Sequence, residues 1–204
     1  MTSSSSLVVG CLAAILLSAC TSSSPPTATE PVSSTAASSA TPTSATPVPT
    51  PTPTWSTEQL AAIRAVEDYR SAIGKIEADP SGFTEAEMRA ALREVAGGDV
   101  IPAKVNTYVA LKKQGFRYDG ETLVVSTKAS RPSDASYGRE VVVTSCLDQR
   151  GLRVLDKTGS EVSEAELGYA IPDFNLCQYT VVKTKGAERF LVYGLSPGKG
   201  ECGP

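Results

Sequence analysis

The chain of 204 residues contains no histidine, only one tryptophan and no run of lysine or arginine. The lack of histidine excludes imidazole as a general acid or base and as a zinc ligand. Because Cys-x-x-Cys and calcium-loop spacings are also missing, we expect no metal and no cofactor. The balance of 19 basic and 22 acidic residues argues against nucleic acid as a partner.

Long hydrophobic segments are also missing, apart from one near the N-terminus. Residues 7–19 are apolar or small, but they are too few for a transmembrane helix, which needs about 20 residues. An apolar segment that begins close to the N-terminus and ends in small residues is typical of an export signal. Residues 1–6 lack Lys and Arg, so only the α-amino group supplies the usual positive charge. We predict that residues 1–19 are a signal peptide.

The end of this leader, Leu17–Cys20, resembles the lipobox of bacterial lipoproteins. The resemblance implies that the Cys20 thiol receives a lipid, that the leader is cut before it, and that the new N-terminus is acylated, as with palmitate. The segment Val8–Cys11 fits the same local pattern, but it has almost no hydrophobic lead-in, so Cys20 is preferred. We therefore expect a protein attached by its lipid to the extracytoplasmic face of the cell membrane.

Residues 20–54 follow as a Ser-, Thr-, Pro- and Ala-rich stretch, with Glu30 as the single charge and eight of the 14 prolines of the chain. No apolar periodicity is present that would offset the entropy of ordering this stretch, so it is predicted to be a disordered linker. Proline-rich linkers act as semi-rigid spacers. Such a spacer would hold a domain away from the membrane.

Residues 55–204 number 150, enough for one domain with its own hydrophobic core. Ser56 and Gln59 form a capping-box pattern ahead of apolar residues at helical spacing, which predicts a first helix. Asp79–Pro80 is expected to end it, because the residue before proline disfavours helical backbone.

Two further helices are predicted next. Thr84 and Glu87 repeat the capping box, and Gly97–Gly98 is expected to end the second helix. A third helix has Pro102 in its first turn and Gly115 as its stop.

Beyond Gly115 the hydrophobic period changes from helical to alternating. Residues 130–138 are expected to form a polar loop between the first two strands. An α+β fold is predicted, in which three N-terminal helices pack on one face of a curved antiparallel sheet. The predicted strands cover 121–127, 139–148, 153–156, 177–184 and 189–195.

This order of elements resembles the nuclear transport factor 2-like superfamily, and more narrowly the actinobacterial lipoproteins that carry that fold. The segments that resemble it are Glu58–Tyr69, Asp79–Pro80, Val141–Asp148, Val154–Gly159 and the last strand up to Cys202. The resemblance implies a cone whose helices and sheet can enclose a pocket. Some members are enzymes that use Asp with His or Tyr, and many are binding domains. This chain departs from the pattern in lacking histidine and a tryptophan in its last strand.

Three cysteines fall in the domain, so one disulfide leaves one thiol over. Cysteines at the positions of Cys146 and Cys202 are similarly placed in the lipoprotein group, which implies that they are bridged. Pairing of Cys177 with Cys202 is the competing connectivity. Cys177 is otherwise expected to be a small buried hydrophobe in a strand.

Catalysis is the less favoured reading of the domain. Three aspartates could act with tyrosine as acid and base only if burial shifted their pKa values: Asp68, Asp148 and Asp156. An Asp after a strand is usually a turn former. No nucleophile motif accompanies them. We expect no enzymatic activity.

Two binding hypotheses are carried forward. In one, four tyrosines, Tyr69, Tyr108, Tyr179 and Tyr193, line the cone around a small apolar ligand, although simple packing of the core is the favoured role for them. In the other, the open sheet face binds a partner protein of the envelope or a second copy, giving a homodimer. Apart from these partners, we expect only the membrane, through the lipid on Cys20.

Overall fold

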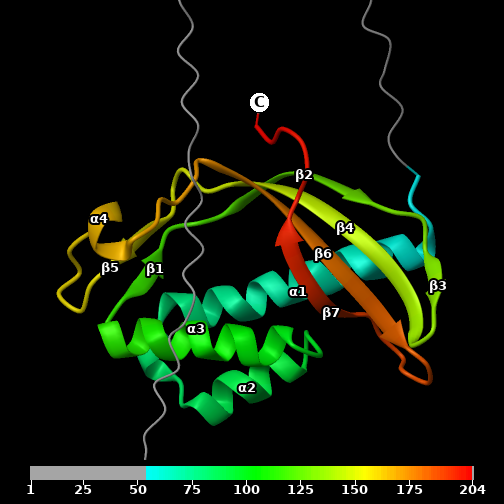
Figure 1. Cartoon of the computed structure of the whole chain (residues 1–204), viewed down its shortest axis with the longest axis horizontal. Coiled ribbons are helices and arrows are strands. Elements are labelled where there is room, and N and C mark those ends of the chain that lie inside the picture. The colour runs from blue at the N-terminus through cyan, green and yellow to red at the C-terminus, as the bar shows by residue number, and fades with distance from the viewer. Residues whose placement is uncertain (1–53, 204) are drawn as a thin grey trace, which may run out of the picture. The chain divides into compact units, whose positions relative to one another are not determined.

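The computed structural model describes residues 54–203, and the predicted signal peptide, Cys20 and the predicted linker up to Pro53 lie outside them. Within the described residues the chain is α+β, with helices followed by an antiparallel sheet, as predicted (Figure 1). No helix in this part is both long enough and apolar enough to cross a membrane.

Helix α1 (Thr57–Ala78) begins at the predicted capping box. The Ser56 hydroxyl accepts from the Gln59 amide, and the Gln59 side chain accepts from the Ser56 amide. The helix ends before Asp79, and Pro80 starts the short 3-10 helix η1 (Pro80–Gly82). Both predicted boundaries are confirmed.

Helix α2 (Glu85–Arg93) also begins at its predicted capping box, but the prediction that Gly97–Gly98 ends it is wrong. The helix ends at Arg93 because the following residues pair with the last strand instead. Ala96 forms a parallel bridge with Val192, and the Gly97 amide donates to the Val192 carbonyl at 2.9 Å.

Helix α3 (Val100–Gln114) contains Pro102 in its first turn and ends at Gly115, as predicted. Gly115 is left-handed, with φ of 73°, and its amide donates to the Leu111 and Lys112 carbonyls. Glycine adopts this backbone without the steric cost that a side chain carries.

The main sheet has the order β2-β4-β6-β7, with β3 also paired to β4, and all of its pairs are antiparallel. A separate two-stranded sheet joins β1 to β5. The strands are β1 (Arg117–Asp119), β2 (Leu123–Ala129), β3 (Ser133–Ala135), β4 (Gly138–Asp148), β5 (Arg153–Leu155), β6 (Phe174–Thr184) and β7 (Leu191–Pro197).

Four short elements were not predicted: the 3-10 helix η1, strands β1 and β3, and helix α4 (Glu164–Leu167). Each has only three or four residues, too few to show a hydrophobic period. Strand β3 falls inside the expected loop 130–138 and lies along the first residues of β4.

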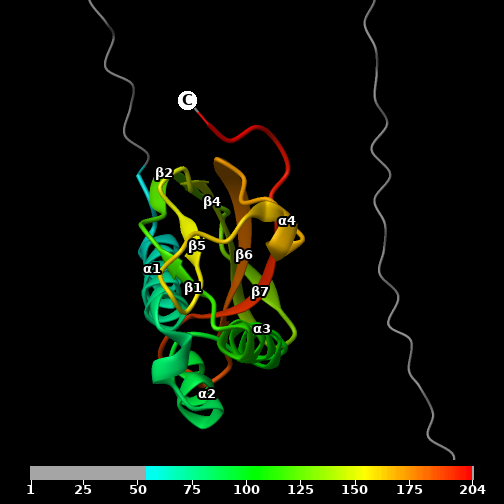
Figure 2. The same ribbon diagram turned by 90° about the vertical axis from the view of Figure 1, so that its left-hand side faces the viewer.

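Helices α1, α2 and α3 lie on one side of the main sheet, and α1 contacts β4, β6 and β7 (Figure 1, Figure 2). The side chains that alternate along β4 and β6 toward the helices, among them Val141, Val143, Tyr179 and Val181, belong to one buried core with α1, α2 and α3. Val192 of β7 completes it.

A disulfide joins Cys146 to Cys202, with their Cα atoms 5.4 Å apart, as the family resemblance implied. The competing Cys177–Cys202 pairing is wrong, and Cys177 is a free thiol on β6. The bridge attaches the C-terminal tail to the long strand β4.

Candidate functional site

Two of the four predicted tyrosines, Tyr69 and Tyr179, line a cavity of about 370 Å³ between α1 and the sheet. Tyr108 is fully buried beside it. Tyr193 lies elsewhere, with its ring against Gly97 and Gly98. The structure therefore brings together three of the four residues and leaves Tyr193 out.

The wall of the cavity on α1 comes from one helix face. Residues 69, 70, 73, 74 and 77 recur at spacings that place them along that face. The opposite walls come from the inner side of β4, β6 and β7 and from the segments around β1 and β5. Ala78, the last residue of α1, also lines the cavity. Beyond α1 the lining is Lys104, Tyr118, Gly120, Thr122, Leu147, Gln149, Leu152, Asn175, Cys177, Tyr179 and Leu195.

Two buried polar atoms at this cavity have no hydrogen-bond partner within residues 54–203: the Tyr69 Oη and the Gln149 Oε1. Tyr69 is 0% exposed, and its ring lies edge-on to that of Tyr179, with centroids 6.3 Å apart. Burial and, to a smaller extent, the nearby Glu77 raise the pKa of Tyr69, so its hydroxyl keeps its proton. Leaving such a group unpaired costs about 1–3 kcal/mol.

Glu77 contributes the acidic group of the cavity. Its carboxylate accepts a hydrogen bond from the Tyr108 hydroxyl at 3.1 Å. Burial raises the pKa of Glu77, against the opposing effects of Lys104 and of the Tyr108 hydrogen bond. Of the carboxyl groups that have a resolved shift in the described residues, this one alone is shifted upward.

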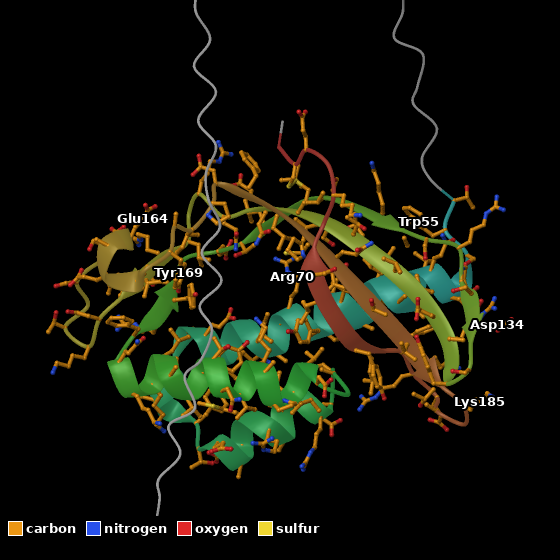
Figure 3. The ribbon with its side chains drawn as sticks, in the orientation of Figure 1. Trp55, Arg70, Asp134, Glu164, Tyr169 and Lys185 are labelled. Atoms are coloured by element: carbon orange, nitrogen blue, oxygen red, sulfur yellow. A yellow bond between two sulfur atoms is a disulfide. The ribbon has the colours of Figure 1, made fainter. Side chains whose placement is uncertain are left out.

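Two cations face the same space. Arg70 donates from Nη2 to the Thr122 carbonyl at 2.9 Å, and Figure 3 shows its side chain between α1 and the sheet. Lys104 lies over the Tyr108 ring, 5.9 Å from its centroid. Within residues 54–203, neither cation forms a salt bridge.

The free thiol of Cys177 also faces the cavity. Burial raises the pKa of Cys177, outweighing a hydrogen bond with Tyr179 that lowers it. A reactive cysteine needs a lowered pKa, so this thiol behaves as a small packing group, although it is half-buried and not fully buried as predicted.

The aspartates considered for acid–base chemistry do not share a site. Asp148 pairs with the exposed Arg150 at 2.6 Å, and Asp156 accepts from the Thr158 and Ser160 amides in a turn. Hydrogen bonds lower the pKa of both aspartates, chiefly from the Arg150 side chain for Asp148 and from the Thr158 hydroxyl for Asp156. Asp68 lies in a surface groove away from the cavity. Residues 54–203 contain no group of three or more His, Cys, Asp or Glu that could hold a metal.

Sequence reasoning missed Arg70, Gly74, Glu77 and Gln149. A signal for Arg70 and Glu77 was present, since they lie seven residues apart within the apolar series of the first helix. Gly74 was a further signal, because a glycine inside a helix is unfavourable. Nothing local marks Gln149, which reaches the cavity only through the fold of the β4–β5 connection.

A larger groove of about 650 Å³ runs over the outer side of α1, between α2 and the β6–β7 hairpin. Acidic and basic side chains are equally frequent along it, and they include Glu58, Arg64, Asp68 and Arg189. Neither of the unpartnered buried atoms lies in this groove. We therefore place the candidate site in the smaller cavity.

No family model and no curated protein matches the sequence. Among solved structures, the chain is similar to the intermembrane space region of the chloroplast protein ARC6, with a TM-score of 0.48, 11% identity, and coverage of 70% of this chain and 97% of that one. It is also similar to a de novo β-sheet design, with a TM-score of 0.29, 16% identity, and coverage of 67% and 87%. At these scores, neither similarity indicates a shared function.

Proposed function

We propose that the chain is a lipid-anchored domain outside the cell membrane that binds a small molecule between α1 and the sheet without catalysing a reaction. The observation that carries the binding function is the hydroxyl of Tyr69, a residue that lines the cavity: this hydroxyl is fully buried and has no partner in the described residues. Buried hydroxyls are almost always hydrogen-bonded. A ligand in the cavity would satisfy this one.

Gly74 supports the same proposal. A glycine inside a helix costs about 0.5–1 kcal/mol relative to alanine. A Cβ at Gly74 would meet nothing within 4 Å, so close packing does not explain the glycine. It widens the cavity, whose volume lies at the lower end of the range typical of small-molecule sites.

The finer fold assignment, a nuclear transport factor 2-like cone, belongs to this proposal. Helices that precede an antiparallel sheet and pack on one of its faces are compatible with it. A cavity between the first helix and the sheet is also what that family resemblance implied.

Anchoring through Cys20 rests on the lipobox-like segment Leu17–Cys20. The Cys146–Cys202 disulfide is compatible with export, because such bonds persist in oxidising compartments. Intact-mass spectrometry of membrane-extracted protein tests the anchor. The expected result is a chain that begins at Cys20 and carries acyl groups, and a Cys20→Ala protein that leaves the membrane. An uncut leader would contradict the anchor.

The non-enzymatic part of the proposal rests on how the polar groups are arranged. The Glu77 carboxyl is paired with Tyr108, and the candidate aspartates lie in exposed turns or outside the cavity. With no histidine in the chain, a general base of near-neutral pKa would have to be Glu77 itself. We assign Glu77 to the wall of a binding site.

Ligand release tests the binding function. Lipoprotein purified from its native membrane would be denatured, and the released small molecules identified by mass spectrometry. We expect one compound in a near-stoichiometric amount from the natural protein and its loss from Gly74→Leu, whose side chain would fill the cavity. Ala90→Leu, at an exposed site on α2, is the matched control. Equal amounts from all three proteins would contradict the proposal.

A partner protein or a second copy is the second candidate, supported by the edge strand β2. Leu123, Val124 and Val125 are 56, 47 and 49% exposed, and an apolar edge strand can pair with another chain. Sedimentation over a range of concentrations tests it. A Val125→Lys variant should lower the sedimenting mass if β2 is the interface.

A further inference from the structure

We propose that the ligand of this cavity is a small monocarboxylate whose anionic group is held by Arg70 and the Tyr69 hydroxyl. This inference rests on the proposed function and adds the chemical class of the ligand. It is carried by three features of the cavity: the balance of its charges, the donors left without acceptors, and its size.

The charges that line the cavity are those of Arg70, Lys104 and Glu77. Neither cation is neutralised by a salt bridge within residues 54–203, and Glu77 is already engaged by Tyr108. The cavity therefore has an excess of positive charge. In a partly buried space of low dielectric, such an excess attracts an anion more strongly than it would in water.

The donors match a carboxylate. Arg70 uses Nη2 for the Thr122 carbonyl, which leaves the other N–H groups of its guanidinium to donate. A guanidinium can donate two parallel hydrogen bonds to a carboxylate, and this pair is among the stronger ones in proteins. The Tyr69 hydroxyl retains its proton, and Tyr69 and Arg70, consecutive residues of α1, both line the cavity.

The remaining wall suits a short apolar body. Ile73, Leu147 and Leu152 line the cavity, and Leu195, which is 40% exposed, stands toward solvent. At about 30 Å³ for each water-sized group, the volume admits roughly ten heavy atoms. This is the size of a benzoate or a short-chain fatty acid.

A phosphate ester fits the cavity less well. Phosphates are usually held by clusters of arginines or by several backbone N–H groups at a helix N-terminus or nest. This cavity offers one guanidinium, one ammonium and one hydroxyl, and a second negative charge would lie near Glu77. A single carboxylate matches that set.

Isothermal titration calorimetry of the lipidated full-length protein in nanodiscs tests the inference, with empty nanodiscs as the blank. The probes are benzoate, its neutral analogue benzamide, hexanoate and inorganic phosphate. We expect benzoate or hexanoate to bind at least tenfold more tightly than benzamide and phosphate. Gly74→Leu should abolish the binding.

Arg70→Gln should weaken carboxylate binding at least tenfold and benzamide binding by a much smaller factor, and Tyr69→Phe should weaken carboxylate binding several-fold. Arg64→Gln removes the same charge from an exposed position of α1 and is the matched control. Melting temperatures of all variants show whether each one folds. Arg70→Lys keeps the positive charge but cannot donate two parallel hydrogen bonds to a carboxylate, so it should bind at an intermediate level.

Equal binding of benzamide and benzoate, or unchanged benzoate binding by Arg70→Gln, would overturn the monocarboxylate and leave the cavity as a binding site. Tighter binding of phosphate would overturn it in favour of phosphate-bearing ligands. If no probe bound but the native protein released a compound on denaturation, only this inference would fail. If no compound was released either, the proposed function would fail with it.

Discussion

The Tyr108 hydroxyl of α3 donates to the Glu77 carboxylate of α1 across 3.1 Å. This bond ties the two helices together at the edge of the cavity. Because burial raises the pKa of Glu77 above its ordinary 4.5, the folded protein holds the carboxyl proton more tightly than the unfolded chain does. The contribution of Glu77 to the free energy of unfolding is therefore fully present below pH 4.5. It is lost as the pH rises from 4.5 through the raised pKa.

Glu77→Gln should therefore gain stability relative to the natural protein as the pH increases, since its amide never ionises and can still accept from Tyr108. We expect similar melting temperatures near pH 4 and a difference that grows in favour of the variant up to pH 8. Glu67→Gln, at an exposed position of the same helix, is the control. A difference that stays constant with pH would contradict a raised pKa of Glu77 in the folded protein.

Loss of the Cys146–Cys202 bridge should lower the free energy of unfolding by about 4 kcal/mol in the chain-entropy treatment, because the bridge closes a loop with a sequence separation of 56. Cys202→Ser tests this by urea denaturation. Cys177→Ser, which removes the free thiol, should change the free energy by about 1 kcal/mol at most. The reverse order of the two variants would show that the bridge does not stabilise the domain.

Gly74→Ala should stabilise the protein by about 0.5–1 kcal/mol, because it improves helix propensity and the new Cβ meets nothing within 4 Å. Gly115→Ala should have the opposite effect and destabilise the protein. Gly115 has a left-handed φ of 73°, which costs about 1–2 kcal/mol for a residue with a side chain. Thermal unfolding of the two variants measures both signs. Destabilisation by Gly74→Ala would mean that the position is more tightly packed than described.

Gly97→Ala should destabilise the protein by about 1–3 kcal/mol, because the added methyl group would collide with the Tyr193 ring. In a double-mutant cycle, Tyr193→Ala should recover part of that loss. Additive effects of the two substitutions would show that the ring does not press on this glycine.

Local chemistry accounts for what the sequence predicted well. The capping boxes at Ser56 and Thr84, the stop at Asp79–Pro80 and the left-handed Gly115 each depend on residues within a few positions of one another. Such interactions can be read from spacing alone. The helix-then-sheet order followed from the change of hydrophobic period.

Tertiary contacts account for the predictions that were wrong and for the site residues that were not predicted. Helix α2 ends early because Ala96 and Gly97 pair with Val192, which lies far along the chain. Tyr193 looked equivalent to Tyr179 in sequence. The β6–β7 register shifts between Thr180, which pairs with Gly194, and Val181, which pairs with Val192. Tyr193 lies at this shift and packs on Gly97. The upward pKa shift of Glu77 depends on burial, which periodicity alone does not quantify.

The position of a bound ligand tests the central claim most directly. Nuclear Overhauser effects would be measured between a bound carboxylate probe, or the compound released from the native protein, and assigned aromatic side chains. We expect contacts to the rings of Tyr69 and Tyr179, which line the cavity between α1 and the sheet. Contacts confined to Phe190, in the groove on the outer side of α1, would contradict the central claim.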